Sequence, residues 1–158
     1  MAYQKLQASS GLAVIPSDEV DIPNPAAEIR NASTTSAVAG KLVDSNADFV
    51  ALGVKIGDII YDTTNNIAAK VNKVDSDTEL TVSIAIPSGA NYTIYAQRDM
   101  PSNGCVLYIG GAGNVALRCA SRSKIVIFKG LVAGQFVPVQ TLRVNTSDTT
   151  ATDIVALW

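Results

Sequence analysis

The chain has 158 residues, of which 47% are apolar and 16% are charged, and its formal net charge is −2. This length and composition predict a folded chain with one core or two small ones, and they argue against disorder. The sequence contains no histidine, so the usual general base, the Ser-His and Cys-His nucleophile pairs and the commonest transition-metal ligand are all missing. We therefore expect no enzyme, no metal site and no cofactor.

Charge and hydropathy also argue against nucleic-acid and membrane partners. Residues 1–97 carry six basic and eleven acidic groups, whereas residues 98–158 carry six basic and three acidic groups. The basic residues of the second part are scattered, and the sequence pI of 4.9 is far from that of a basic nucleic-acid-binding domain. No apolar run approaches the roughly 20 residues of a membrane-spanning helix, and the amino terminus lacks the pattern of a cleaved export signal.

Residues 1–35 are predicted to form an extended N-terminal arm. The segment holds Pro16, Pro23 and Pro25 and shows no sustained alternation of apolar and polar residues. Each proline lacks a backbone donor and favours extended conformations in the residue before it. The apolar residues of such an arm would need another surface to cover them, either in the same subunit or in a neighbour.

Residues 36–97 are predicted to form a small β-barrel of the SH3 or OB type. Short alternating runs separated by polar turn clusters are typical of strands in such a module. One helical turn is expected between the first two strands, capped by Ser45 or Asn46 and ended by Gly53. The expected strands are 37–43, 58–61, 67–74, 79–84 and 92–95.

Residues 98–158 are predicted to be all strand and to form a β-sandwich or jelly-roll-like domain that the arm completes. Gly111-Ala-Gly113 suits a three-residue hairpin loop between the first two of these strands. The final apolar run and Trp158 indicate a last strand that is packed into a sheet. The expected strands are 104–110, 114–120, 124–128, 135–139, 142–145 and 154–158.

Three motifs resemble known functional sites, but each is explained more simply as a structural element. Asp44-Ser-Asn-Ala-Asp48 begins like a calcium loop, but Phe49 stands where glycine is required and Lys55 where glutamate is required, so a cap and turn is favoured. The acidic cluster at residues 75–79 is read as a turn between strands. Gly110-Gly-Ala-Gly-Asn114 lacks the lysine, hydroxyl and helix of a phosphate loop and is read as a hairpin.

The two cysteines, Cys105 and Cys119, lie on the two arms of the predicted hairpin. A loop centred on Ala112 would place the two cysteines opposite each other, and this cross-strand geometry would permit a disulfide. Free thiols in the core are the favoured interpretation. Two cysteines without histidine do not make a metal site.

The two ends of the chain resemble a family of small tailed-phage and gene-transfer-agent proteins identified as head-spike base proteins. The closing segment Pro138-Val-Gln-Thr-Leu-Arg-Val with Thr149-Thr-Ala-Thr152 and a terminal apolar strand is similar to the close of that family. Ile15-Pro-Ser-Asp-Glu-Val-Asp-Ile-Pro-Asn-Pro25 resembles its opening, and Leu107-Tyr-Ile-Gly-Gly111 its central strand. Residues 42–62 and 73–82 resemble a small β-barrel module that recurs in phage structural proteins, which implies an insertion into the sandwich.

This resemblance implies a viral structural protein: a capsid-attached decoration or cement protein, or a head-spike base subunit, of a tailed bacteriophage. We expect it to assemble in the bacterial host cytoplasm, to reside in the virion, and to bind copies of itself, as a trimer or pentamer, and the major capsid protein or other virion proteins. Ile15, Val20, Ile22 and Pro23 are the expected contacts to a neighbouring subunit, and Val155, Leu157 and Trp158 are expected to close the sandwich.

The alternative is a receptor- or glycan-binding module of a phage tail or spike. Tyrosine rings stack on sugars, and this interpretation would use exposed Tyr92 and Tyr95 or the loops of the inserted barrel. Because most aromatic residues alternate within strands, packing is the favoured role for them.

Overall fold

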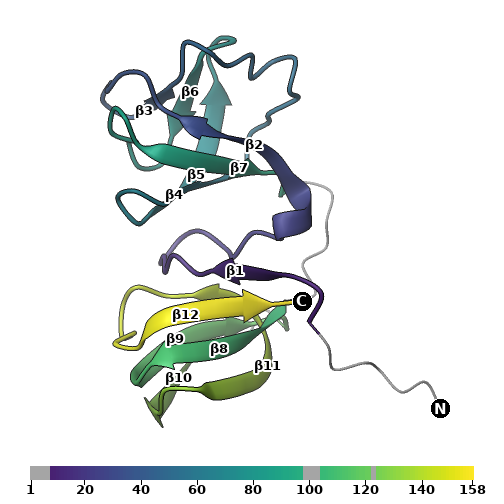
Figure 1. Cartoon of the computed structure of the whole chain (residues 1–158), viewed down its shortest axis with the longest axis vertical. Helices are drawn as coiled ribbons and strands as arrows, with labels where there is room; N and C mark the ends of the chain where they lie inside the picture. The colour runs from purple at the N-terminus through teal and green to yellow at the C-terminus, as the bar shows by residue number, and fades with distance from the viewer. Residues whose placement is uncertain (1–7, 98–103, 122–123) are drawn as a thin grey trace, which may run out of the picture. The chain divides into compact units, whose positions relative to one another are not determined.

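The computed structural model describes residues 8–97, 104–121 and 124–158, and over these residues the fold is all-β, as the sequence predicts. The described residues form twelve strands in two antiparallel sheets of six strands each, and Figure 1 shows these strands. One short 3-10 turn, η1 (Pro25–Ala27), is capped by Asn24, whose side chain accepts a hydrogen bond from the Ala26 amide. No described segment is a long apolar helix of the kind that crosses a bilayer.

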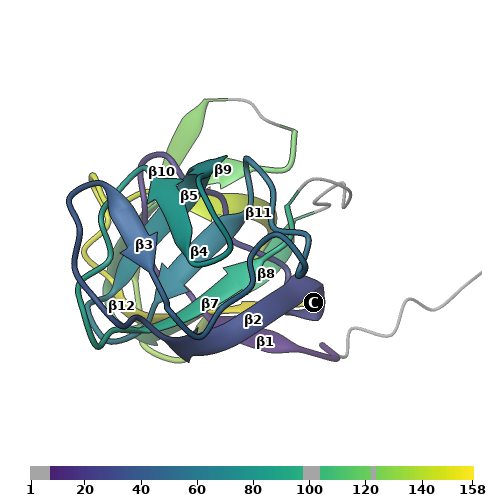
Figure 2. The ribbon, with the colours of Figure 1, turned by 90° about the horizontal axis from the view of Figure 1, so that it is seen from above.

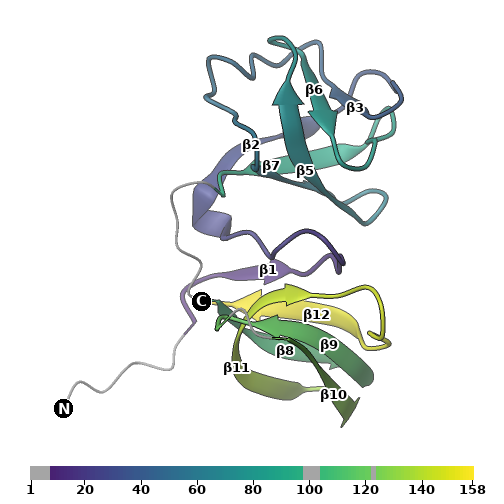
Figure 3. The ribbon, with the colours of Figure 1, turned by 180° about the vertical axis from the view of Figure 1, so that it is seen from behind.

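The first of two compact units is built from the described residues up to Asp18 and those from Gly104 onward. Its sheet has the strand order β1-β12-β8-β11-β9-β10 (Figure 3). Alternation along β8 and β12 buries one face, with Leu107 and Ile109 on β8 and Ile154 and Ala156 on β12. The strands are β1 (Gly11–Ala13), β8 (Cys105–Gly111), β9 (Gly113–Cys119), β10 (Ile125–Leu131), β11 (Gln135–Val144) and β12 (Thr152–Leu157).

The N-terminal segment completes this first sheet. β1 pairs with β12 in antiparallel register, with Leu12 opposite Ala156. Beyond the strand, the Val14 amide donates to the Ile154 carbonyl at 2.8 Å. The Asp18 carboxylate then accepts hydrogen bonds from the amide and the hydroxyl of Ser147, at 3.0 and 2.8 Å. Residues 11–18 are therefore held by this chain's own C-terminal strand and the loop before it.

The second unit begins at Glu19 and contains the strands up to β7. Its sheet has the order β2-β7-β4-β5-β6-β3, and β2 and β7 run side by side in Figure 2. Its core is apolar and includes Leu42, Phe49, Ile60, Leu80 and Ile94, none of which is exposed. The strands are β2 (Glu28–Ser33), β3 (Lys41–Val43), β4 (Ile59–Asp62), β5 (Ile67–Val74), β6 (Glu79–Val82) and β7 (Asn91–Tyr95).

The two edges of the second sheet are linked by the chain that follows β2. The Thr35 amide donates to the carbonyl of Val43 in β3 at 2.9 Å, and Ser36 forms an isolated antiparallel bridge with Val43. A closed small barrel has this connectivity. The assignment to an inserted SH3- or OB-like barrel stays a prediction.

The segment expected to be one arm, residues 1–35, contributes to both sheets. β1 belongs to the first sheet, whereas β2 pairs with β7 of the second, with Ala32 opposite Tyr92. Glu28–Ser33 lacks strong apolar alternation and carries Arg30 and Asn31, which is why the sequence pattern does not single it out as a strand. The compact second unit accordingly starts before residue 36.

The predicted hairpin around Ala112 is wrong. β8 and β9 do not pair with each other, because β11 lies between them in the sheet. Gly111 pairs with Thr152 of β12, and Gly113 pairs with Leu131 of β10. The glycines instead permit close packing, since a Cβ on Gly110 would lie 2.5 Å from the carbonyl oxygen of Asp153. The two predicted strands at residues 135–139 and 142–145 are one continuous strand, β11.

The predicted helical turn before β4 forms with a different cap. The Asp48 side chain, not Ser45 or Asn46, accepts from the Ala51 amide at 2.8 Å, and its carbonyl accepts from the Leu52 amide at 2.9 Å. Gly53 follows at φ 72°, a conformation that glycine adopts without strain. The turn is too short to count as a helix.

Candidate functional site

β10 is an edge strand formed by the apolar run Ile125-Val-Ile-Phe128. It pairs with β9, with Val126 opposite Leu117 and Phe128 opposite Val115. The register shifts after Phe128, where Gly130 adopts φ 67° and its amide donates to the Asn114 side chain at 3.0 Å. No strand of the described residues pairs with the other edge of β10.

The apolar side chains of β10 are exposed on both of its faces. Ile125, Val126 and Ile127 are 40%, 43% and 40% exposed. Successive residues of a strand point to opposite faces, so three exposed neighbours mean that apolar side chains are partly open to solvent on both faces of this strand. An exposed, apolar and unpaired strand edge is a template for binding another chain. We call residues 124–129 the β10 edge.

Further apolar surface lies on the turn after β10 and on β11. Val132 in that turn and Phe136 on β11 are both more than half exposed. Phe136 contacts Tyr108 of β8 edge-to-face, with ring centroids 5.4 Å apart. The ring is thus held in place on one side while the rest of it faces solvent, as an aromatic anchor in a protein interface does.

The sequence segment that contains the β10 edge carries only basic charge. Residues 104–147 contain no aspartate or glutamate, and they contain five basic residues. Two of these, Lys124 and Lys129, are exposed and flank the apolar run. The edge therefore combines an apolar centre with a positively charged rim.

The second unit has its own exposed apolar loop between β3 and β4. Val50, Leu52 and Ile56 project from it, and Ile56 is the most exposed at 68%. The loop is anchored by Phe49, whose side chain is fully buried and whose amide donates to the Asp77 carbonyl at 2.7 Å. We call residues 48–56 the apolar loop.

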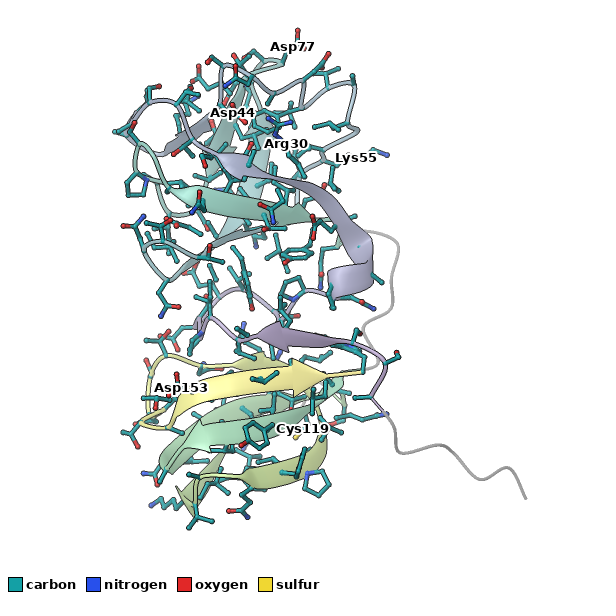
Figure 4. The ribbon with its side chains drawn as sticks, in the orientation of Figure 1. Arg30, Asp44, Lys55, Asp77, Cys119 and Asp153 are labelled. Atoms are coloured by element: carbon teal, nitrogen blue, oxygen red, sulfur yellow. The ribbon has the colours of Figure 1, made fainter. Side chains whose placement is uncertain are left out.

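A buried polar network holds the second unit together behind this loop. Asp44 accepts from the Arg30 guanidinium at 2.7 Å and from the Tyr92 hydroxyl at 2.7 Å, and Arg30 also donates to that hydroxyl at 2.8 Å. Arg30 and Asp44 are labelled in Figure 4. The Asn46 amide occupies the other Asp44 oxygen at 2.9 Å. The network ties β2, β7 and the chain after β3 into one structure.

The electrostatics of this network fix its protonation. Burial alone would raise the pKa of Asp44, but hydrogen bonds from Tyr92, Arg30 and the Asn46 amide outweigh it and hold the pKa below the usual 3.8. Burial and the adjacent Asp44 carboxylate raise the pKa of the Tyr92 hydroxyl. The carboxylate is therefore charged and the phenol neutral at neutral pH, and the network is structural in character.

The acidic motifs of the sequence are engaged within the chain. Asp44 is committed to Arg30, so the Asp44–Asp48 segment works as a turn. Asp75 receives hydrogen bonds from Lys41, Lys73 and Thr81, which lower its pKa well below the usual range. The described part of the chain has no cluster of three or more His, Cys, Asp or Glu side chains suited to a metal ion.

The cysteines are free thiols, as favoured from the sequence. They are not opposite each other: Cys105 and Cys119 pair with Thr141 from its two sides. Their Cα atoms are thus about two strand spacings apart, roughly 9 to 10 Å, which exceeds the reach of a disulfide. Cys105 is buried, and burial raises the pKa of its thiol to about 12.

The residues expected to contact a neighbouring subunit are buried in this chain. Ile15, Val20 and Ile22 are each less than 7% exposed, and Pro23 is also buried. The exposed apolar surface lies instead on the β10 edge and on the apolar loop. The four consecutive apolar residues 125–128 do not mark an edge, since such a run is typical of a buried strand. The sequence signal for this surface is the absence of acidic residues from 104 to 147.

Of the residues expected to close the sandwich, Val155 and Leu157 lie on β12, but the face of β12 that is buried is the opposite one. Val155 and Leu157 are half-buried, while Ile154 and Ala156 are the buried positions of β12. Trp158 is half-buried as well, and its amide and carbonyl bond to the backbone of Ser10. The strand itself is packed between β1 and β8.

The tyrosines considered for sugar stacking are not exposed. Tyr92 is 1% exposed, and its hydroxyl belongs to the Asp44 network. Tyr95 is 5% exposed and packs edge-to-face on Tyr61. A glycan site built on Tyr92 and Tyr95 is therefore wrong for this structure, because β7 turns both side chains into covered positions.

Comparison of the chain with protein-family models, with curated proteins and with solved structures finds no match. The resemblance of its ends to phage proteins therefore remains an expectation from the sequence.

Proposed function

We propose that this protein is a structural component of a tailed-phage virion, a capsid-attached decoration, cement or head-spike base subunit that acts by binding other protein subunits. The single observation that carries the proposal is the β10 edge, where Ile125, Val126 and Ile127 are exposed on an unpaired strand. Exposed apolar edges are a liability in a solitary protein and are normally blunted or covered. A partner subunit would cover this one.

The rest of the molecule is consistent with a binding role. Both units are antiparallel sheets, and in the second unit Arg30, Asp44 and Tyr92 hydrogen-bond to one another beside an apolar core. Such scaffolds present surfaces without needing chemistry of their own. The closing segment that resembles head-spike base proteins lies in the first unit, the same unit that carries the β10 edge, whereas the opening segment, residues 15–25, runs from the first unit into the second.

The test uses particles of the phage that encodes the chain. Purified protein is mixed with particles from a deletion strain, and the bound fraction is measured by sedimentation and quantitative gel analysis. We expect saturable binding that the variant Ile125→Asn/Ile127→Asn weakens by about thirtyfold or more, since removal of a hot-spot residue costs about 2 kcal/mol or more and every 1.4 kcal/mol is a factor of ten.

The matched control is Ile84→Asn, which removes an isoleucine of similar exposure, 48%, from the second unit. Binding by this variant should equal that of the wild type. Failure of the wild-type protein to bind particles at any concentration would refute the proposed function.

A further inference from the structure

The two units carry opposite net charges. The first unit, residues 1–18 with 102–158, has six basic and three acidic residues, a net charge of +3. The second unit, residues 19–101, has six basic and eleven acidic residues, a net charge of −5. Surfaces of opposite sign attract and orient one another during association. A chain with this asymmetry has a built-in preference for contacts between unlike units of different copies.

Pairing of two β10 edges with each other would oppose this preference. In an antiparallel pairing that aligns Val126 with Ile127 of the other copy, Lys124 of each copy stands opposite Lys129 of the other. Like charges directly across strands are destabilising. The neighbouring strands β8, β9 and β11 contain no acidic residue that could offset the repulsion. The β10 edge is therefore complementary to an apolar surface that carries acidic residues.

The apolar loop of the second unit has that character. Its exposed Val50, Leu52 and Ile56 are accompanied by two exposed carboxylates, Asp48 and Asp77. Asp77 is fixed beside the loop, because its carbonyl accepts the Phe49 amide at 2.7 Å. Lys55 is on the same loop, and in Figure 4 its side chain extends sideways, whereas Asp77 lies at the top of the unit.

We propose that the β10 edge of one copy docks on the apolar loop of a second copy, with Lys124 and Lys129 facing Asp48 and Asp77. This inference rests on the proposed function, and it identifies a partner for the β10 edge. The contact joins two different surfaces, so a pair of copies keeps a free loop on the first copy and a free β10 edge on the second. Such head-to-tail contacts build rings when the rotation closes and filaments when it does not.

A charge-swap experiment tests the pairing. Variant A is Lys124→Glu/Lys129→Glu, and variant B is Asp48→Lys/Asp77→Lys. Sedimentation velocity over a dilution series measures the mass of wild type, A, B, an equimolar mixture of A and B, and the chain carrying all four changes. Lys70→Glu is the control for A, because Lys70 is exposed on β5 of the second unit.

We expect wild type to form oligomers, and A and B each to dissociate at roughly tenfold higher concentration than wild type, the effect of reversing rim charges. The mixture of A and B and the fourfold variant should recover association, because each restores opposite charges across the contact. Lys70→Glu should behave as wild type. Circular dichroism of every variant should match wild type.

Two results would overturn the inference. In the first, wild type is a monomer throughout the series. In the second, either the fourfold variant does not recover association, or variant B associates as tightly as wild type. The latter is expected if the β10 edge pairs with itself, because that contact would not contain the apolar loop. In either case, particle binding that is lost on Ile125→Asn/Ile127→Asn would leave the proposed function standing with another virion protein as the partner. Loss of particle binding by wild type would instead refute the proposed function itself.

Discussion

Replacing Asp44 by alanine should destabilise the second unit more than any surface substitution. The Asp44 side chain is 1% exposed and accepts hydrogen bonds from the Arg30 guanidinium, the Tyr92 hydroxyl and the Asn46 amide. Removing one partner of a buried ion pair costs about 3 to 5 kcal/mol. The Arg30 side chain is 21% exposed, so water can solvate part of its charge. We therefore expect a loss of about 3 kcal/mol, at the low end of that range.

Urea unfolding followed by far-UV circular dichroism measures this loss, and thermal melting should show a fall in Tm of about 6 to 12 °C for a chain of this size. Tyr92→Phe deletes only one hydrogen bond and should cost about 1 kcal/mol. Asp77→Ala is the control, because its side chain is exposed, and it should change stability by about 0.5 kcal/mol or less. A loss below about 1 kcal/mol for Asp44→Ala would refute the assignment of this network as the main polar support of the unit.

The network of Arg30, Asp44 and Tyr92 also predicts how the free energy of unfolding changes at low pH. The pKa of Asp44 is lower in the folded chain than its usual value, so its stabilising contribution is complete above the unfolded pKa of about 3.9 and is lost as the pH falls through the folded pKa. The difference in unfolding free energy between wild type and Asp44→Ala should therefore be constant from about pH 5 to pH 8 and shrink below about pH 4. A difference that keeps its full size at the lowest pH where both chains fold would contradict this.

Two further predictions concern the first unit. Of the two thiols, Cys119 should react readily with Ellman's reagent at pH 8 while Cys105 reacts only on unfolding, because Cys105 is buried and its pKa is about 12; equal rates would be inconsistent with this packing. Gly110→Ala should destabilise the chain by about 1 to 3 kcal/mol in urea unfolding, since the new Cβ would meet Asp153 backbone, whereas Gly130→Ala has open space and should cost only about 1 kcal/mol for its positive φ.

Local patterns predict the strands of this protein well. The run Ile67–Val74 alternates between apolar and polar residues, and it is strand β5 with the same bounds. Turn chemistry also works locally: Asp62 accepts the amides of Thr64 and Asn65 in the turn that follows β4. These signals succeed because side-chain alternation and turn hydrogen bonds are decided within a few residues.

The order of strands in a sheet depends on contacts between distant residues, and the hairpin predicted from the local sequence is wrong for this reason. A glycine-rich link between two strand-like segments is typical of a hairpin, yet β11 comes from later in the chain and takes the place between β8 and β9. The two glycines serve the packing of β8 against β12, since Gly110 and Gly111 allow the close approach of Thr152 and Asp153. No pattern around Ala112 distinguishes the two uses of glycine.

The candidate site depends on the same non-local information. Periodicity identifies a strand near residues 124–128, but only the sheet order makes it an edge, and only the fold leaves Ile125 and Ile127 uncovered. The Arg30, Asp44 and Tyr92 network joins residues 14 and 48 positions apart. The absence of acidic residues from 104 to 147 is the one sequence feature that distinguishes this surface.

Binding of the purified chain to particles that lack it tests the central claim, that the protein works by covering its β10 edge against other subunits. We predict that wild type sediments with the particles to saturation and that Ile125→Asn/Ile127→Asn stays in the supernatant at the same concentration while remaining folded. Equal binding of the folded double variant and wild type would contradict the claim.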